Sequence, residues 1–261
     1  MSESDDKSFW EHLDDLRGVL LRIIGLSLLF GIVAFCFKEV LFDVILAPTK
    51  SDFITYRLLN SIAEHIGSQA TSFSIELINI SLAQQFIIHM KSAFCAGLLC
   101  ASPYIIYAIL KFLSPALYNH EKRYVYGLVG SGYAMFVIGI LLCYFLIFPL
   151  TFRFLGTYQV SSEVSNMISL NSYMSTFIGM CLMLGIVFEL PVLCWLFAKL
   201  GVLNASFMQN YRKHAVVVIL ILAAIITPTS DAFTLALVGV PMWLLYELSI
   251  QVVKKSKKID L

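Results

Sequence analysis

The sequence predicts an all-α integral membrane protein that crosses the bilayer several times. Hydrophobic residues make up 59% of the 261 residues and charged residues only 13%, whereas an ordinary soluble domain has about 45–50% apolar and about 25% charged residues. The mean hydropathy is +0.84. The apolar residues fall in long blocks rather than in alternating or 3.6-residue patterns, so we expect a single polytopic membrane domain over residues 1–261.

Four apolar blocks are long enough to cross a hydrocarbon core of about 30 Å, which needs about 20 helical residues. They are Val19–Phe37, Phe86–Leu110, Val125–Phe148 and Tyr173–Phe197. Two shorter blocks, Ala215–Ile226 and Phe233–Ile250, are separated only by the turn from Thr227 to Ala232. Because backbone groups in lipid must be bonded internally, we expect this Pro-containing turn at a membrane surface. The last two blocks are then either short crossings through a locally thin bilayer or a re-entrant hairpin.

The distribution of Lys and Arg predicts the orientation. With six crossings, most basic residues fall on the side that carries both ends of the chain. The positive-inside rule places that side in the cytoplasm, which predicts a multi-pass protein of the cytoplasmic (inner) membrane. Residues 1–18 then form a cytoplasmic N-terminal segment, 251–261 a cytoplasmic basic tail, and 38–81 an external loop or cap with small helices of its own.

Composition and motifs argue against several classes of function. The net charge is +1 and the six cysteines contain no C-x-x-C pair, which argues against a nucleic-acid partner, a disulfide framework and a zinc site. No P-loop or H-E-x-x-H pattern occurs. Ser131 has no histidine deep in a later span that could make it a protease nucleophile. We therefore expect no cofactor, no metal, no nucleic acid and no enzymatic activity.

Two acidic residues in the later apolar blocks are candidates for function. Glu189 lies near the middle of its block, where an ionisable group is costly and usually faces other protein. A local explanation is also open, in which Glu189 is protonated or hydrogen-bonded beside a kink at Pro191. Glu247 lies near the cytoplasmic end of the last block, where Lys254 or another basic residue is its expected partner. That pair is as readily structural as functional.

Polar and proline residues also mark the expected external breaks. Asp231, next to Pro228 in the turn, is expected to cap the last helix, since a carboxylate accepts hydrogen bonds from free N–H groups there. Pro48 and Gly67 are expected to break helices within the external segment.

Four sequence elements, which occur in order along nearly the whole chain, carry a resemblance to a known family. They are His12-Leu13-x-x-Leu16-Arg17, Ser114-Pro115-Ala116-Leu117-Tyr118 with His120-Glu121-Lys122-Arg123, Phe188-Glu189-Leu190-Pro191, and Thr227-Pro228 with Asp231 leading to Pro241 and Leu245-Tyr246-Glu247. Together they resemble the TatC family, the multi-span receptor subunit of the twin-arginine protein translocase. Each element is weak alone, but their combination is quite specific.

The resemblance implies six transmembrane helices in a concave, cupped arrangement with short fifth and sixth spans, which agrees with the block lengths. It implies a receptor that binds twin-arginine signal peptides at its cytoplasmic face. It also implies single-span TatA- or TatB-type partners, a complex that can contain several copies of this chain, and export of folded proteins driven by the proton motive force without a nucleotide.

The resemblance also implies roles for particular residues. Glu121 matches the family's signal-recognising glutamate, and Asp15 occupies the position of its N-terminal acidic residue. The expected signal-peptide site comprises Glu121, Asp15, Arg17 and His12. Glu189, with Glu247, is expected to contact a partner subunit within the membrane. The residues expected to have structural roles are Pro48, Pro191, Pro228, Asp231 and Pro241.

Two other functions remain as alternatives at this point. A proton-coupled secondary transporter of a small solute would use Glu189, but it needs a polar cavity at the midplane. The polar positions gather at the cytoplasmic face instead, which favours a receptor. A membrane scaffold without a ligand predicts that Glu121 is freely replaceable.

Overall fold

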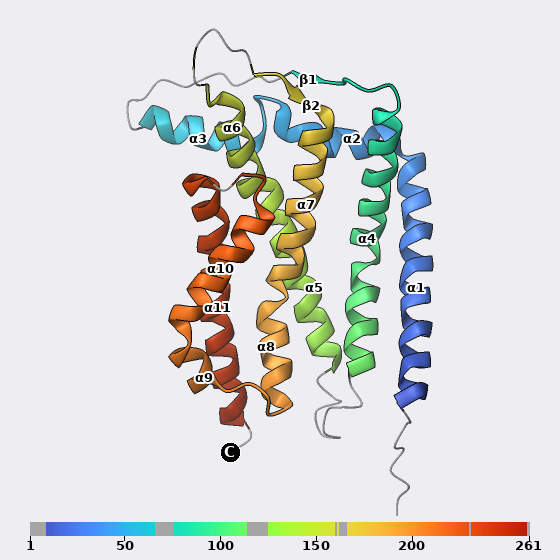
Figure 1. Ribbon diagram of the computed structural model, residues 1–261, viewed down its shortest axis with the longest axis vertical. Helices are drawn as coiled ribbons and strands as arrows, with labels where there is room; N and C mark the ends of the chain where they lie inside the picture. Colours follow the sequence, from blue (N-terminus) through green and yellow to red (C-terminus); the bar gives the residue numbers. More distant parts are fainter. Residues whose placement is uncertain are drawn as a thin grey trace, which may run out of the picture. The chain divides into compact units, whose positions relative to one another are not determined.

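The computed structural model describes residues 9–65, 76–113, 125–159, 161, 166–229 and 231–259. Most of these residues lie in helices (Figure 1). In chain order the elements are α1 (Phe9–Cys36), α2 (Lys38–Leu46), the 3₁₀ turn η1 (Ala47–Thr49), α3 (Ile54–His65), β1 (Leu77–Ile78), α4 (Gln84–Leu113), α5 (Val125–Leu142), the π-helical stretch η4 (Cys143–Ile147), α6 (Phe148–Thr157), β2 (Ile168–Ser169), α7 (Leu170–Phe188), α8 (Leu190–Lys199), α9 (Ala205–Asn210), α10 (Arg212–Ile226) and α11 (Ala232–Ile259).

Five helical segments of the described chain are long and apolar enough to cross a membrane. They are Leu13–Cys36, Gln84–Phe112, Gly127–Thr157, Leu170–Lys199 and Ala232–Ser256. Four of them correspond to the four long apolar blocks, and the last contains the block Phe233–Ile250. The third span runs through α5, η4 and α6, and the fourth joins α7 to α8. The predicted α-helical, multi-pass membrane class is confirmed.

The last two helices differ in length more than the sequence suggested. α10 has 15 residues, which reach about 22 Å at 1.5 Å per residue and fall short of a core of about 30 Å. This confirms the prediction of a short fifth helix. The sixth helix is longer than its apolar block, because α11 has 28 residues, contains Pro241 and continues through the basic tail to Ile259. Lysine is a good helix former, so nothing in the tail ends the helix.

The chain divides into two compact units, residues 1–37 with 93–133 and residues 38–92 with 134–261. In the first unit α1 and α4 touch through small residues. A Cβ atom added at Gly97 would lie 2.6 Å from the backbone nitrogen of Gly31 and 2.8 Å from its Cα, and would also clash with the Ser27 carbonyl oxygen. Only glycine therefore permits this contact, the usual device where helices approach closely in lipid.

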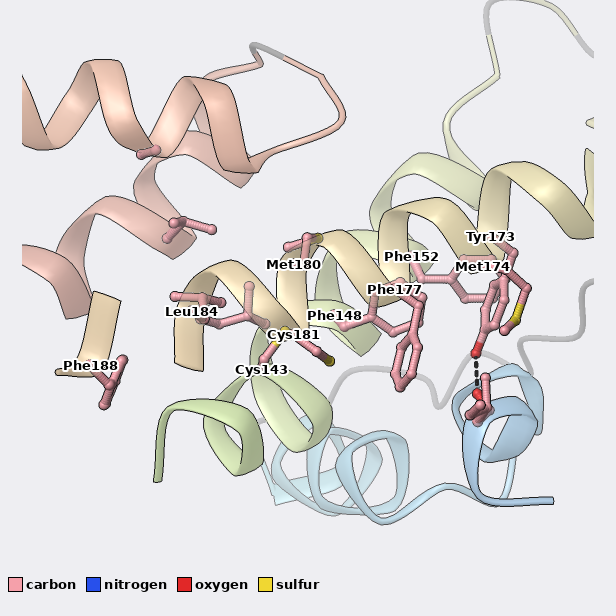
Figure 2. Packing of buried hydrophobic residues seen from close by; sticks show 14 of the residues in the cluster. Cys143, Phe148, Phe152, Tyr173, Met174, Phe177, Met180, Cys181, Leu184 and Phe188 are labelled. Carbon is pink, nitrogen blue, oxygen red and sulfur yellow. Dashed lines mark hydrogen bonds between the residues drawn. The ribbon is translucent and has the colours of Figure 1, made fainter. Parts of the chain in front are cut away.

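The core of the second unit lies between η4, α6 and α7. Phe148 packs edge to face against Tyr173 and Phe177, with ring centroids 5.1 and 4.9 Å apart. This arrangement stabilises aromatic pairs in addition to the free energy gained from burying their surface. Figure 2 shows these rings side by side, with Cys143 and Cys181 in contact further along α7. Because the core joins helices far apart in the sequence, it fixes the frame on which the remaining elements pack.

The short helices of the second unit lie at its two ends. α2 and α3 run across the direction of α6 and α7 at one end, where β1 pairs in parallel with β2 (Figure 1). α9 and the C-terminal end of α11 lie at the other end. Residues 38–65 therefore form helices at one end of the second unit, and we refer to them as the cap. The predicted break at Pro48 falls in η1, whereas Gly67 lies outside the described residues.

Candidate functional site

The residues expected to bind a signal peptide lie at the start of α1 and in the segment after α4. Asp15 and Arg17 stand in the second and third turns of α1, and both are exposed. His12 also lies in α1, but its side chain is outside the described part of the chain, and so is Glu121. The juxtaposition of Asp15 and Glu121 therefore stays a prediction.

Glu189 stands at the junction between α7 and α8. α7 ends at Phe188 and α8 begins at Leu190 with Pro191 in its first turn. The proline interrupts the span because it has no backbone N–H to continue the helical hydrogen bonds. Glu189 is half-buried. Its Oε1 atom is fully buried and has no hydrogen-bond partner among the described residues, which is costly for a carboxylate inside a membrane.

A close helix contact lies directly beside Glu189. A Cβ atom added at Gly139 of α5 would lie 2.8 Å from the Leu184 carbonyl oxygen and 2.8 Å from Cβ and Cγ of Phe188. Glycine is therefore required for α5 to pass this close to the end of α7. The contact fixes the backbone immediately before Glu189 and so limits the directions in which its carboxylate can point.

Glu247 forms an ion pair with Arg212 rather than with Lys254. The Nη2 atom of Arg212 lies 2.8 Å from Oε2 of Glu247, and the neighbouring Tyr246 donates a hydrogen bond of 2.8 Å to the Met208 carbonyl. Both contacts tie α11 to the chain at the start of α10. This geometry gives Glu247 a structural partner, and the arginine side chain remains half exposed.

Asp231 has the geometry of a helix N-cap. Its Oδ1 accepts a 2.9 Å hydrogen bond from the Thr234 N–H, and its Oδ2 accepts from the hydroxyls of Thr229 and Thr234 at 2.5 and 2.6 Å. Burial raises the pKa of this carboxyl, but the hydrogen bonds outweigh burial and hold the pKa of Asp231 below its ordinary value. Thr227 has extended backbone angles, as the residue before Pro228 should, so this turn is closely defined.

Pro48 lies where the cap meets η4, α6 and α7. Three tyrosine hydroxyls point at backbone carbonyls around it. Tyr144 donates to Val44 at 2.7 Å, Tyr173 donates to Ile45 at 2.8 Å, and the Tyr56 hydroxyl lies 3.0 Å from the Pro48 carbonyl and 3.1 Å from that of Pro149. Figure 2 shows the bond from Tyr173 as a dashed line to α2.

Sequence reasoning did not single out the partners in these contacts. Tyr144, Tyr173 and Arg212 are each unremarkable in the sequence, and their partners are 35 to 128 residues away. The available signal was indirect, because a proline inside a helix always leaves a carbonyl without its donor. It indicates that a donor is needed but not which side chain supplies it.

Known proteins resemble this chain over nearly its whole length. A family model described as Sec-independent protein translocase protein (TatC) matches residues 11–241. The TatC protein of Blattabacterium sp. subsp. Periplaneta americana is 34% identical over 257 residues, which cover 96% of each chain. The TatC protein of Desulforapulum autotrophicum is 33% identical over 265 residues, which cover 100% of this chain and 90% of that one.

Solved structures share the fold. The crystal structure of a twin-arginine translocase receptor, TatC, matches with a TM-score of 0.75 and 31% identity, covering 95% of this chain and 100% of that chain. A second crystal structure of a TatC receptor, in DDM, matches with a TM-score of 0.75 and 30% identity. The similarity thus extends through the cap and the last two helices.

Proposed function

The chain belongs to the TatC family of Sec-independent protein translocase proteins, and from this premise we propose that it is the signal-peptide receptor of a twin-arginine translocase. In this role it binds twin-arginine signal peptides at its cytoplasmic face and supports export of folded proteins, driven by the proton motive force. The observation that carries the proposal is the match over residues 11–241. It favours a receptor over a small-solute transporter that uses Glu189.

The proposed orientation places both ends of the chain in the cytoplasm of a cell with an inner membrane. Basic residues support it: Lys111 lies in the last turn of α4, Lys199 in the last turn of α8, and Arg212 at the start of α10. Lys254 and Lys255 follow on the same face of the membrane at the end of α11. By the positive-inside rule this face is cytoplasmic.

The proposed signal-peptide site combines Asp15 and Glu121 with His12 and Arg17 nearby. Arginine keeps its charge and offers a planar fork of donors, so a carboxylate that bonds it in bidentate fashion is its natural receptor. Lysine lacks that geometry. An exposed ion pair contributes only about 0–1 kcal/mol, so two such pairs select the signal and still allow its release.

Local basic residues make recognition an exchange of ion-pair partners at the two carboxylates. Lys122 and Arg123 follow Glu121, and Arg17 lies two residues after Asp15, so these carboxylates have basic neighbours before a signal arrives. The arriving arginines then replace them. Within the membrane, Glu189 is proposed to meet a polar side chain of a TatA- or TatB-type single-span subunit, in a complex that includes further copies of this chain.

A peptide-binding experiment tests the receptor proposal. Purified chain in lipid nanodiscs is incubated with a crosslinkable twin-arginine signal peptide and with its twin-lysine counterpart. We expect crosslinking to the first to exceed crosslinking to the second, and to fall in Glu121→Gln and further in the double variant with Asp15→Asn. The neighbouring exposed acid provides the matched control, Asp14→Asn, which should bind normally. Equal crosslinking of both peptides, or normal binding by the double variant, contradicts the proposal.

A further inference from the structure

α3 has three distinct faces. Thr55 and Tyr56 are buried against the rest of the unit. Arg57 and Glu64 form an exposed polar face. Ile54, Leu58 and Ile62, which are spaced four residues apart and so share one side of the helix, are 61%, 62% and 49% exposed. We call these three residues the apolar stripe of α3.

The buried face of α3 contacts a membrane span at the end of its apolar block. The Thr55 hydroxyl donates to the carbonyl of Phe145, and the Tyr56 hydroxyl lies 3.1 Å from that of Pro149. Both carbonyls belong to the span Gly127–Thr157. The span continues for eight residues beyond Pro149, which is about 12 Å at 1.5 Å per residue. Phe145 lies three residues before the end of the apolar block Val125–Phe148. α3 therefore lies at the level where that block ends, beside α6 rather than beyond it (Figure 1).

The surface next to α3 is itself apolar and exposed. Phe145 and Leu146, on the span at the level of α3, are 37% and 43% exposed. Phe53, which precedes Ile54 in the chain, stacks on Phe145 with centroids 5.9 Å apart. The apolar stripe is thus continuous with a face of the span that a multi-pass membrane protein turns toward lipid.

The polar face of α3 fits the other side of a membrane interface. The Nε atom of Arg57 donates a 2.6 Å hydrogen bond to Asp52 Oδ1, and this hydrogen bond lowers the pKa of the Asp52 carboxyl. Both side chains are more than half exposed. A helix with one face on protein, one apolar face and one charged face meets the requirements of an interfacial position, where the apolar face enters the boundary between headgroups and acyl chains.

We propose that α3 is an interfacial anchor whose apolar stripe inserts among the lipid acyl chains of the leaflet on the cap side. The occupant of this surface is lipid, because the stripe lies at the level where the apolar block of the span ends and adjoins the exposed apolar face at Phe145 and Leu146. The assignment does not depend on signal-peptide recognition. The role of α3 is to hold the cap in the plane of the membrane, while the tyrosine contacts hold the cap against the spans.

Site-directed fluorescence quenching tests this assignment. The starting chain carries Cys36→Ser and Cys100→Ser, because these are the two exposed cysteines in the described part of the chain. Leu58→Cys and Ile62→Cys sample the stripe, and Arg57→Cys and Glu64→Cys are matched controls on the same helix. Each variant is labelled with a small thiol-reactive fluorophore and reconstituted in phosphatidylcholine and phosphatidylglycerol vesicles. Quenching is measured with acyl-chain spin-labelled phosphatidylcholine and, separately, with aqueous iodide.

We expect the labels at positions 58 and 62 to be quenched several-fold more by the spin-labelled lipid than the labels at 57 and 64, with the reverse order for iodide. Equal quenching at all four positions would overturn the proposal. Thiol crosslinking tests the other occupants. If position 58 or 62 instead crosslinks to a second copy of the chain or to another protein, and is shielded from both quenchers, the stripe is a protein interface and the lipid assignment is wrong.

Discussion

Tyr144 donates its hydroxyl hydrogen to the carbonyl oxygen of Val44, which is the carbonyl that Pro48 leaves without a helical donor. A proline removes the N–H that would bond to the carbonyl four residues earlier, and inside a membrane an unpaired carbonyl costs several kcal/mol. The tyrosine belongs to the stretch η4, a hundred residues further along the chain. One bond thus compensates for the break in α2 and docks the cap on a span.

Two further prolines have a hydroxyl partner of the same kind. Pro149 frees the carbonyl of Phe145, to which Thr55 of α3 donates. Pro103, inside α4, frees the carbonyl of Leu99, to which Ser102 donates at 2.7 Å. The second case is local and the first joins the cap to a span. Hydroxyl side chains therefore let these helices bend or change register without leaving a carbonyl unbonded.

The buried hydroxyl of Tyr173 is expected to stabilise the cap measurably. Replacing it in Tyr173→Phe leaves the carbonyl of Ile45 without this donor in a buried position, which costs about 1–3 kcal/mol. Chemical denaturation in mixed micelles should show a free energy of unfolding lower by that amount. Tyr158→Phe is the control, since Tyr158 is 65% exposed and should unfold like the unmodified chain. Equal stability of both variants would argue against the docking role.

The contact between α1 and α4 is expected to tolerate no side chain at Gly97. Gly97→Ala places a methyl group against the backbone of Ser27 and Gly31, and such overpacking costs about 1–3 kcal/mol. Gly25→Ala is the matched control, because nothing lies within 4 Å of its added Cβ. Alanine's higher helix propensity should leave that variant neutral or slightly more stable. Denaturation of both variants measures the difference, and a Gly97→Ala chain as stable as Gly25→Ala would contradict the packing argument.

The Asp231 cap is expected to make stability depend on pH in the acid range. Because the folded pKa of Asp231 lies below its ordinary value, its stabilisation is complete above the unfolded pKa of about 3.9. It is lost as the pH falls through the lower folded pKa. Asp231→Ala should lose about 1 kcal/mol at neutral pH, as a lost N-cap does.

Asp231→Asn separates the charge from the cap. Asparagine is also a good N-cap, so this variant should keep most of the stability at neutral pH and lose the acid-range dependence that Asp231 contributes. Thermal unfolding from pH 7 down to pH 3 checks both variants. A stability profile for Asp231→Asn that matches the unmodified chain at every pH would show that the carboxylate contributes no charge effect.

Glu189 is expected to face a partner rather than lipid. Its buried Oε1 lacks a hydrogen-bond donor among the described residues, and a lipid-facing carboxylate would cost more than one exposed hydrogen bond returns. Glu189→Ala should therefore reduce crosslinking to a single-span subunit and reduce export. Glu189→Gln, which keeps a hydrogen-bonding side chain, should retain more of both. Wild-type levels of crosslinking and export in Glu189→Ala would mean that the carboxylate has no such role.

The predictable parts of this molecule are those set by local sequence. Block length was enough to predict the long spans and the short α10, because the bilayer thickness fixes the number of residues required. The cap by Asp231 followed from the residues next to it in the turn. Glu247 was expected to pair with a basic residue, but Lys254 was suggested first and Arg212 is the observed partner. The sequence predicts in which helix each residue lies, but it does not predict the residue's contacts with distant parts of the chain.

The remaining features depend on contacts between distant segments. Nothing local marks Thr55 as the donor for Phe145, or Tyr173 as the donor for Ile45, because these pairs form only when the cap docks. The length of α11 exceeds that of its apolar block for a related reason. Hydrophobicity falls after Ile250, but a helix can leave the membrane and continue in water. Hydropathy reports where the lipid ends, not where the backbone hydrogen bonds end.

The π-helical stretch has a consequence for how this span can vary in length. The N–H of Phe148 bonds to the carbonyl of Cys143, five residues back, so the stretch holds one residue more than an α-helix would. Each residue turns an α-helix by about 100°. Deleting one residue between Cys143 and Ile147 would therefore restore an ordinary α-helical turn and leave Pro149 and the residues after it in nearly the same directions around the span axis. Deleting a residue elsewhere in the span would instead rotate them by more than a quarter-turn, away from the hydroxyl of Tyr56. A relative with one residue fewer in the π-helical stretch would therefore hold its cap with the same set of side chains.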